Sequence, residues 1–85
     1  MSLNIFIGGN GMNIEVRLFA TFREGRQKKY FLQVEEDTKI VDILNKLNID
    51  EEEVSIMLLN GIDGEGNRSL SEGDILSLFP PVGGG

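Results

Sequence analysis

The chain has 85 residues, which is enough for one compact domain and too few for two. It contains no Cys and no His, so nucleophilic cysteines, Ser-His-Asp relays and ordinary zinc sites lack the side chains they need. We therefore expect a protein that is not an enzyme by itself, with no metal and no cofactor bound by this chain. The net charge of -6 repels phosphate backbones, so we expect no nucleic acid among its partners.

The sequence also lacks the patterns of a membrane or exported protein. No apolar run approaches the roughly 20 residues that a helix needs to span a bilayer. The N-terminal segment has neither a basic stretch nor an apolar stretch long enough for export. We expect a cytoplasmic protein with no membrane partner.

Residues 1–11 form a separate N-terminal extension in our interpretation. They end in a glycine-rich turn, and Met12 follows at once with a regular alternating segment behind it. One interpretation is that these residues come from cloning or from an upstream start. The other is an extra edge strand, because Leu3, Ile5 and Ile7 alternate with other residues. The predicted organisation is this extension, a domain over residues 12–79 and a tail over residues 80–85.

The first part of the domain has the pattern of a β-hairpin. Apolar residues alternate from Ile14 to Ala20, which is typical of a half-buried strand. Residues 21–28 are polar and contain Gly25, which can take a positive φ angle. The alternation resumes at Tyr30 and continues to Val34, so the two runs predict paired strands.

One amphipathic helix is predicted next. Thr38 is a plausible N-cap, and the apolar residues that follow it are spaced at i, i+3, i+4 and i+7. The acidic residues 35–37 suit the positive end of the helix dipole. The apolar positions are Ile40, Ile43, Leu44 and Leu47, and the polar face keeps Lys39, Asp42, Asn45 and Lys46. We interpret the apolar stripe as core.

Two further strands complete the predicted sheet. A charged connection over residues 48–53 leads into an apolar strand, Val54 to Leu59, and the segment 61–67 is rich in loop residues. A turn at residues 71–74 precedes the last strand, Ile75 to Phe79, which ends at Pro80 and Pro81. Strands on one side and a single helix on the other predict a two-layer α+β domain with a mixed sheet.

One face of this sheet is expected to bind a partner. A single helix covers only one face, and the alternation directs Phe19, Phe31, Ile75 and Phe79 to the other. An exposed cluster of three phenylalanines and one isoleucine indicates a partner surface. The alternative is that the N-terminal extension seals these side chains into the core.

The basic residues around the first turn have two interpretations. Arg23, Arg26, Lys28 and Lys29 could contact an acidic partner or simply form a soluble hairpin tip, and we prefer the second. The segment 63–67 imitates the start of a calcium loop, but the residue that should be a bidentate Glu is an Asp, so we interpret it as a turn.

Four segments give this chain a family resemblance. They are Leu18 to Glu24, Val34 to Thr38, Leu70 to Asp74 and, most specifically, the tail Leu78-Phe79-Pro80-Pro81-Val82-Gly83-Gly84-Gly85. Together they resemble the MoaD and ThiS sulfur carriers of the ubiquitin-like superfamily, with MoaD the nearer match. Three features depart from the family: Gly83 stands where a small non-glycine residue is usual, residues 60–66 are richer in glycine and acid, and residues 1–11 have no counterpart.

The resemblance implies a ubiquitin-like β-grasp fold and a role as a carrier. In such a cycle an adenylating enzyme of the MoeB or ThiF kind uses ATP to activate the carboxylate of Gly85. A persulfide donor then converts it to a thiocarboxylate, which delivers sulfur to an acceptor. In molybdopterin synthase a MoaE-like large subunit supplies the catalytic side chains and the acceptor is a pterin precursor. The resemblance therefore implies that this chain is the small subunit of molybdopterin synthase, in molybdenum or tungsten cofactor biosynthesis. The residues themselves leave the acceptor open, and a thiamine intermediate or another sulfur acceptor is an alternative.

The composition of the tail suits this chemistry on physical grounds. Forming an acyl-adenylate needs a site that excludes water, so the tail must enter a narrow tunnel. Gly83, Gly84 and Gly85 have no side chains that would clash there. Pro80 and Pro81 form a stiff spacer, and the segment from Val82 onward adds roughly 13 Å of reach. No other side chain of this chain is expected to be catalytic.

Other roles remain open from the sequence. The same tail would suit a ubiquitin-like modifier that is joined to lysines through Gly85. A noncovalent ubiquitin-like interaction module would leave the tail incidental. A glycine-rich end is also found in frayed termini and expression remnants.

Overall fold

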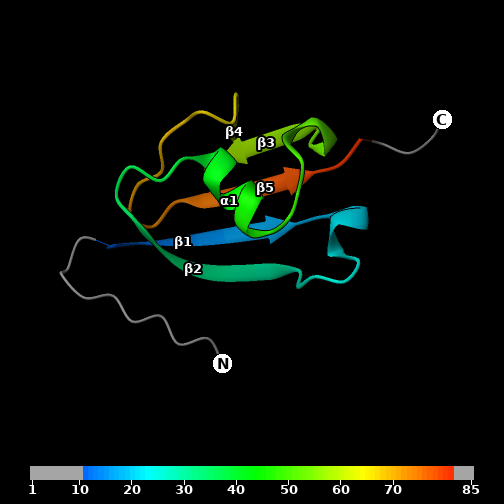
Figure 1. Ribbon diagram of the computed structural model, residues 1–85. Helices are drawn as coiled ribbons and strands as arrows, with labels where there is room; N and C mark the ends of the chain where they lie inside the picture. Colours follow the sequence, from blue (N-terminus) through cyan, green and yellow to red (C-terminus); the bar gives the residue numbers. More distant parts are fainter. Residues whose placement is uncertain (1–10, 82–85) are drawn as a thin grey trace.

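The computed structural model describes residues 11–81 of the chain, and the thin grey traces in Figure 1 mark the remainder. Five strands and one α-helix form the described part, with two short 3-10 helices between them. In chain order they are β1 (Gly11–Leu18), η1 (Ala20–Arg23), β2 (Lys29–Glu35), α1 (Ile40–Lys46), η2 (Glu51–Glu53), β3 (Ile56–Leu59), β4 (Ile62–Asp63) and β5 (Ile75–Phe79).

The five strands form one mixed sheet in the order β2-β1-β5-β3-β4. β1 pairs antiparallel with β2 and parallel with β5, while β3 pairs antiparallel with both β5 and β4. The first and last strands therefore lie side by side at the centre (Figure 1). This arrangement confirms the predicted α+β class and the ubiquitin-like β-grasp fold.

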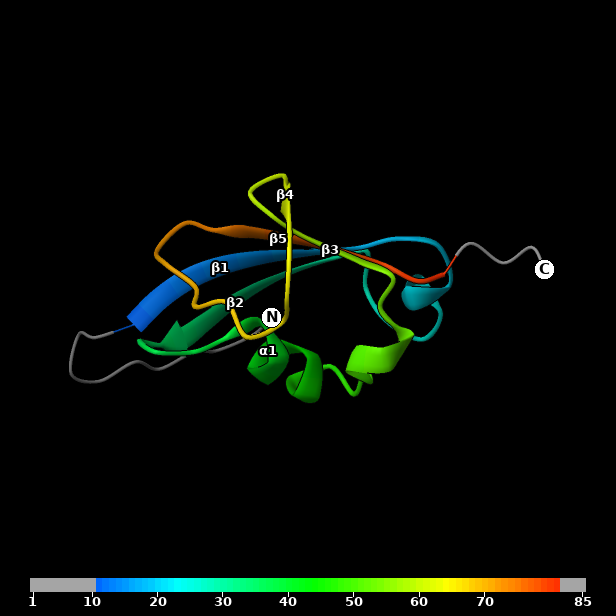
Figure 2. The same ribbon diagram turned by 90° about the horizontal axis from the view of Figure 1, so that it is seen from above.

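The core lies between the sheet and α1, which covers one face only (Figure 2). Alternate residues of β1 and β5 point toward the helix and are fully buried, as the alternation predicts. The helix adds its apolar stripe to them, whereas its predicted polar face is exposed. The side chains with almost no exposure are Ile14, Val16, Leu18, Ile40, Ile43, Leu44, Leu76 and Leu78.

The predicted N-cap of α1 is wrong by one residue. Lys39 occupies that position with extended backbone angles, and the carboxylate of Asp42 accepts a hydrogen bond from its N–H at 2.9 Å. The hydroxyl of Thr38 instead donates to the carbonyl oxygen of Glu35 at 2.6 Å. Thr38 therefore stabilises the turn that leaves β2, while Asp42, three residues beyond the cap, satisfies a free backbone donor of the helix.

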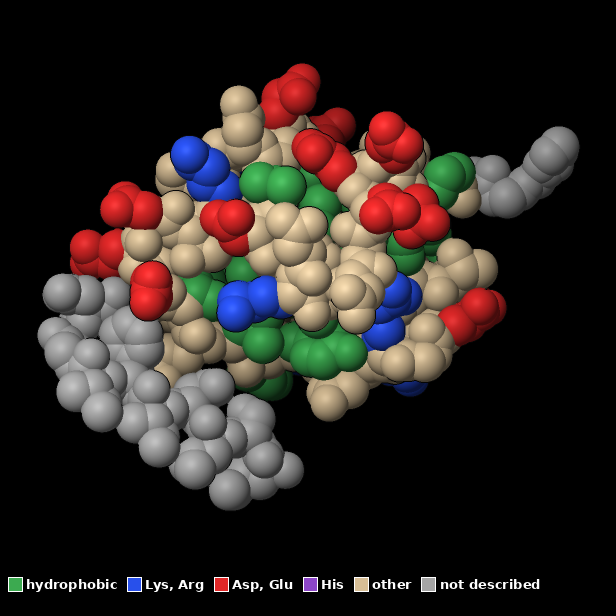
Figure 3. Space-filling view, in the orientation of Figure 1, with side chains coloured by type: hydrophobic (Ala, Val, Ile, Leu, Met, Phe, Trp, Pro, Cys, Tyr) green, Lys and Arg blue, Asp and Glu red, His purple; other side chains and the backbone are tan. Residues whose placement is uncertain are grey.

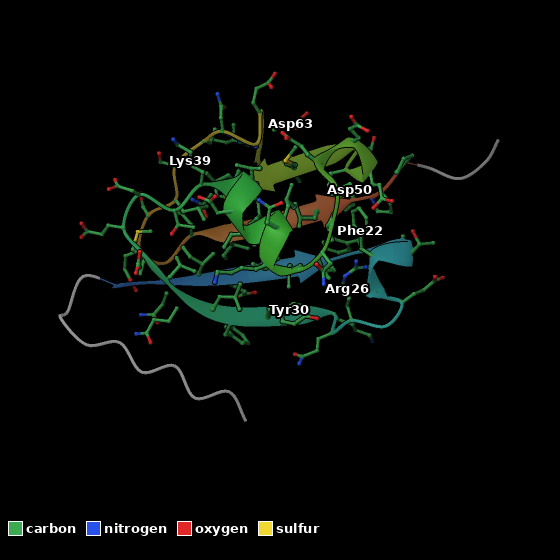
Figure 4. The ribbon with its side chains drawn as sticks, viewed as in Figure 1. Phe22, Arg26, Tyr30, Lys39, Asp50 and Asp63 are labelled. Carbon is green, nitrogen blue, oxygen red and sulfur yellow. The ribbon has the colours of Figure 1, made fainter. Side chains whose placement is uncertain are left out.

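The connection between β1 and β2 is more ordered than its polar composition predicted. β1 ends at Leu18, because Ala20 takes a φ angle of +55° and starts the η1 turn. Phe22 in that turn is buried with 6% exposure, so it belongs to the core. Arg26 donates hydrogen bonds to the carbonyl oxygens of Leu47 and Asn48, at 3.1 and 3.0 Å (Figure 4). It thereby satisfies carbonyls just beyond the end of α1.

The segment between α1 and β5 also departs from the predicted elements. The strand expected from Val54 begins only at Ile56, after the short η2 helix, and the segment 61–67, which was expected to be a loop, contains the short strand β4. Arg68 holds the following loop by donating to three carbonyl oxygens, those of Met57, Ile62 and Glu65, at 2.8, 2.7 and 2.7 Å. One side chain thus replaces regular secondary structure in this loop.

The boundaries at the two ends can be compared only in part. β1 begins at Gly11, one residue before the predicted start of the domain, and the other residues of the predicted extension lie outside the described part. Among residues 11–81, no helix is long and apolar enough to cross a membrane.

Candidate functional site

The end of the described chain leaves the molecule from the central strand β5. The carbonyl oxygen of Phe79, the last residue of β5, accepts a hydrogen bond from the N–H of Ser55 at 2.8 Å. Pro80 is half-buried and Pro81 is exposed. The start of the tail is therefore held by the sheet up to Phe79 and projects from one end of it. The remaining tail residues, Val82, Gly83, Gly84 and Gly85, lie outside the described part.

Two aromatic rings stack beside this exit. The rings of Phe19 and Phe79 have centroids 4.3 Å apart and planes inclined by 7°. The guanidinium carbon of Arg23 lies 5.2 Å from the centre of the Phe19 ring, and its Nε donates to the carbonyl of Leu18 at 2.7 Å. This arrangement fixes the orientation of both rings. Arg23 is thus committed to a structural contact.

Pro80 and Pro81 lie between two different hollows. One has a volume of about 500 Å³ and is lined mostly by apolar groups, including Ala20, Ile56 and Phe79. The other has a volume of about 570 Å³, and its lining adds Phe22, Arg26 and the carboxylates of Glu24, Glu52 and Glu53. A partner that receives the tail therefore meets an apolar surface on one side of it and an acidic surface on the other.

The four predicted partner-binding residues share the sheet face opposite α1, but they do not form one cluster. Phe19 and Phe79 stack near the tail, whereas Phe31 and Ile75 flank Glu15 in a row across β2, β1 and β5. Phe31 is 68% exposed, and the other three are half-buried. The expectation of a single exposed cluster is therefore wrong.

A charged cluster separates Phe31 from the Phe19–Phe79 stack. The carboxylate of Glu15 accepts a hydrogen bond from Arg17 Nε at 2.5 Å, and Lys29 Nζ lies 3.6 Å from the same oxygen. Glu15 and Arg17 belong to β1, and Lys29 lies opposite Arg17 on the edge strand β2. Alternation along one strand cannot reveal which residues of other strands lie alongside.

The ion pair changes the titration of Glu15. The hydrogen bond from Arg17 lowers its pKa below the usual 4.5, the charges of Arg17 and Lys29 lower it further, and partial desolvation opposes them. In acid the unfolded chain therefore binds more protons than the folded one. The stability contributed by Glu15 is fully present above the unfolded pKa and is lost as the pH falls through the lower, folded pKa.

This linkage predicts how a Glu15→Gln variant behaves. We expect the variant to melt below the wild type at neutral pH and the difference to shrink as the pH falls below 4.5. Thermal melts across that range, followed by circular dichroism, measure the effect. Glu53→Gln removes a carboxylate that does not contact Arg17, and it serves as the control. A difference between wild type and Glu15→Gln that stayed constant with pH would contradict the assignment.

Sequence reasoning found Phe79, Pro80 and Pro81 but missed other residues that line the two hollows. Glu52 and Glu53 were interpreted only as part of a solvated charged run, and Ile56 only as a strand residue. Ile56 is 41% exposed and lies opposite Phe79 in the β3–β5 register, so it extends the apolar surface beside the tail. The available signal was the position of Phe22 within a polar segment, which indicated that the loop folds back on the core.

The described groups near the exit do not include a means of activating a carboxylate. The charged groups in the hollow are the carboxylates of Glu24, Glu52 and Glu53 and the guanidinium of Arg26, and none of these groups converts a carboxylate into an electrophile. The fold and this exit define a small ubiquitin-like β-grasp protein whose last strand leads into the C-terminal segment.

Comparison with known proteins identifies the family. The model described as the ThiS family matches residues 16–85. Small archaeal modifier protein 3 of Haloferax volcanii is 37% identical over an alignment of 93 positions, gaps included, and the alignment covers 87% of this chain and 100% of that protein. The chain belongs to the ThiS family.

Solved structures agree with this assignment. The solution structure of the Haloferax volcanii HVO 2177 protein has 31% identity and a TM-score of 0.76, covering 96% of this chain and 94% of that one. A chain in the complex of subunits 1 and 2 of the Helicobacter pylori molybdopterin-converting factor has 26% identity and a TM-score of 0.61. That match covers 87% of this chain and 100% of the other. The chain is thus similar both to a chain of a molybdopterin-converting factor complex and to a protein named as a modifier.

Proposed function

We propose that this protein is a sulfur carrier whose Gly85 carboxylate is adenylated and then converted to a thiocarboxylate. The observation that supports the proposal most directly is the exit of the tail from the central strand β5 through Pro80 and Pro81. The family match also extends to Gly85. In this role the chain supplies the reacting group and a partner supplies the catalysis.

The tail and the folded domain contribute differently to the affinity for a partner. Fixing each glycine of the tail costs about 1–2 kcal/mol of backbone entropy, so the tail contributes little affinity. The surface beside the exit, formed by the Phe19–Phe79 stack, Ile56 and the apolar hollow, is available to contribute it. Half-buried rings are already ordered, so docking them loses little further conformational freedom.

The proposed pathway is molybdenum or tungsten cofactor biosynthesis. The Helicobacter pylori neighbour is one chain of a complex between two subunits of molybdopterin-converting factor, and by analogy this chain would dock on a MoaE-like large subunit. Upstream, an ATP-using adenylating enzyme of the MoeB or ThiF kind would activate Gly85, and a persulfide donor would supply the sulfur. The action would take place in the cytoplasm.

A second candidate is a ubiquitin-like modifier joined to lysines through Gly85. The Haloferax volcanii relative with 37% identity is named a modifier, which favours this alternative specifically. The two functions need the same activated tail and differ in the group that attacks it. One chain could therefore serve both.

Intact-mass measurement of the protein purified from its native cells tests the proposal. Sulfur carriage predicts a species heavier by the exchange of one oxygen for sulfur, located by fragmentation at the C-terminal residue. Conjugation predicts high-mass species with an isopeptide bond at Gly85. A chain end that remained an unmodified carboxylate while the cells were making the cofactor would contradict sulfur carriage.

Phe79→Ala is expected to weaken partner binding more than it weakens the fold. The substitution removes a half-buried ring stacked at 4.3 Å on Phe19, so binding should fall roughly tenfold or more, as at an interface hot spot. Calorimetric titration against the adenylating enzyme measures the affinity, and circular dichroism checks folding. Phe31→Ala, at the far end of the same face, is the matched control. Loss of folding in Phe79→Ala would place this ring in the core instead.

A further inference from the structure

Within residues 11–81, the sheet has one long free edge, formed by β2. β2 has seven residues, and β1 is its one partner among the described strands, whereas β4 at the opposite edge has only two residues. A long free edge offers unpaired backbone donors and acceptors to another strand. The strand β1 separates this edge from β5, which leads into the tail, and the inference drawn from the edge does not rest on the proposed function.

The register determines which backbone groups face outward. Leu18 donates its N–H to the carbonyl of Lys28 at 2.8 Å, and residues in an antiparallel pair face the partner strand at alternate positions. Tyr30, Leu32 and Val34 therefore direct their backbone groups toward β1. The outward groups belong to Lys29, Phe31 and Gln33, and no residue in the described part of the chain forms a hydrogen bond with them.

Apolar side chains border this edge on both faces of the sheet. Tyr30 and Leu32 lie half-buried on the helix side, next to Leu47 beyond the end of α1, and Phe31 is 68% exposed on the other side. The space-filling view shows apolar side chains over β2 with basic side chains beside them (Figure 3). An added strand would therefore cover apolar surface with either of its faces.

The two ends of the edge have opposite charge. Although the chain has a net charge of -6, Lys28 and Lys29 stand at the start of β2, and residues 35–37 at its other end are all acidic. Lys46 lines a polar hollow of about 460 Å³ together with Tyr30, at the basic end. Within residues 11–81, neither Lys28 nor Lys46 has an acidic partner within ion-pair distance.

We propose that the free edge of β2 binds an extended segment of a partner protein by adding it as a strand to the sheet. The segment lies antiparallel to β2, because antiparallel pairing is the more stable arrangement. Its alternate aliphatic side chains cover Tyr30 and Leu32. Its acidic residues, at the C-terminal end, lie beside Lys28 and Lys46, and its basic residues lie beside Glu35. Main-chain hydrogen bonds supply the affinity, and the two charged ends determine the direction in which the segment binds.

The test uses the full chain and a synthetic peptide, acetyl-Lys-Lys-Val-Thr-Val-Thr-Val-Asp-Asp-Asp-amide. Its binding should slow amide hydrogen exchange at Lys29, Phe31 and Gln33 and leave the inward amides of Tyr30 and Leu32 unchanged. A peptide with the charged ends exchanged should bind about tenfold more weakly at low salt, since three exposed ion pairs are lost. Equal or tighter binding of the exchanged peptide would overturn the proposed direction of the bound strand.

Two variants separate backbone pairing from other contacts. Gln33→Pro removes an outward N–H that β1 does not use, which an edge strand tolerates, and it should abolish binding. Gln33→Ala keeps that N–H and should bind within about twofold of wild type, because its backbone donor is intact. If Gln33→Pro has a lower melting temperature than the wild type, Lys46→Glu gives an independent measurement. We expect its affinity for the peptide to be several-fold weaker.

Three other results would overturn the proposal. One is the absence of any change at the outward amides of β2 at millimolar peptide. The second concerns the chain without peptide. If the outward amides of β2 are already protected, and deletion of residues 1–10 removes this protection, the segment paired with the edge is this chain's own extension. The third is protection that disappears on dilution, which would make the occupant a second copy of the chain.

Discussion

Deletion of Gly84 and Gly85 is expected to abolish both thiocarboxylate formation and conjugation while leaving the melting temperature unchanged. Within residues 11–81, the last hydrogen bond of the sheet is at Phe79, and Gly84 and Gly85 lie beyond the described part of the chain, so we expect the fold to survive their deletion. Without them, the tail that starts at Pro80 and Pro81 is two residues shorter, and its last residue is Gly83. Each lost residue shortens the reach by about 3.3 Å, so the carboxylate stops short of the activating site.

Incubation with the adenylating enzyme, ATP and a sulfur donor, followed by intact-mass measurement, checks this expectation. Val82→Ala is the matched control, because it alters the tail but keeps its length and its last residue. A truncated chain that still gained a sulfur atom or formed conjugates would refute the assignment of the reacting carboxylate to Gly85. A truncated chain that kept every biological activity without either modification would refute both covalent functions and leave a noncovalent role.

Leu44→Ala is expected to unfold a large fraction of the molecule. Leu44 has no exposure and lies on the face of α1 that covers the sheet, so truncation leaves a cavity at the centre of the only core in the described chain. Such changes cost about 2–5 kcal/mol, which is comparable to the whole stability of a small domain. We expect the melting temperature to fall by roughly 10–30 °C.

Chemical denaturation followed by circular dichroism measures the loss. Phe31→Ala is the control, because its ring is 68% exposed and its removal should cost about 0.5 kcal/mol or less. A Leu44→Ala variant as stable as Phe31→Ala would show that α1 is not essential for covering the sheet.

The parts of the fold that follow a local rule were predictable from the sequence. Alternation predicted β1, β2 and β5 and the side of the sheet to which their residues point. The i, i+3, i+4 spacing predicted α1 and its buried stripe. Each of these depends on residues a few positions apart, and burial then selects the same face along the whole element.

The parts that depend on register were not predictable in the same way. The separation of Phe31 from Phe79 follows from the alignment of Glu15 and Arg17 between them, which only strand pairing determines. The contact of Arg26 with the end of α1 joins residues more than twenty positions apart, and nothing in the polar run around it indicates a partner. Thr38 was wrongly predicted as the N-cap of α1. A threonine hydroxyl can cap a helix or hydrogen-bond within a turn, and here it donates to Glu35 in the turn that follows β2.

The residues of the tail could be predicted from the sequence, but the surface around its exit could not. The glycine tail and its proline spacer are visible in the sequence, and their role remains a prediction. The apolar and acidic hollows on either side of Pro80 and Pro81 come from Ile56, Glu52 and Glu53, which lie more than twenty residues earlier in the chain. Only the folded sheet brings these residues to the exit.

The central position of β5 determines how the molecule responds to a mechanical load. A partner that pulls on the tail pulls along the axis of β5, against the parallel ladder with β1 and the antiparallel ladder with β3. Force applied along a strand loads its hydrogen bonds together in shear, and β5 shares that load between two ladders, whereas an edge strand has only one. The attachment point of the tail is therefore supported on both sides against a pull along β5.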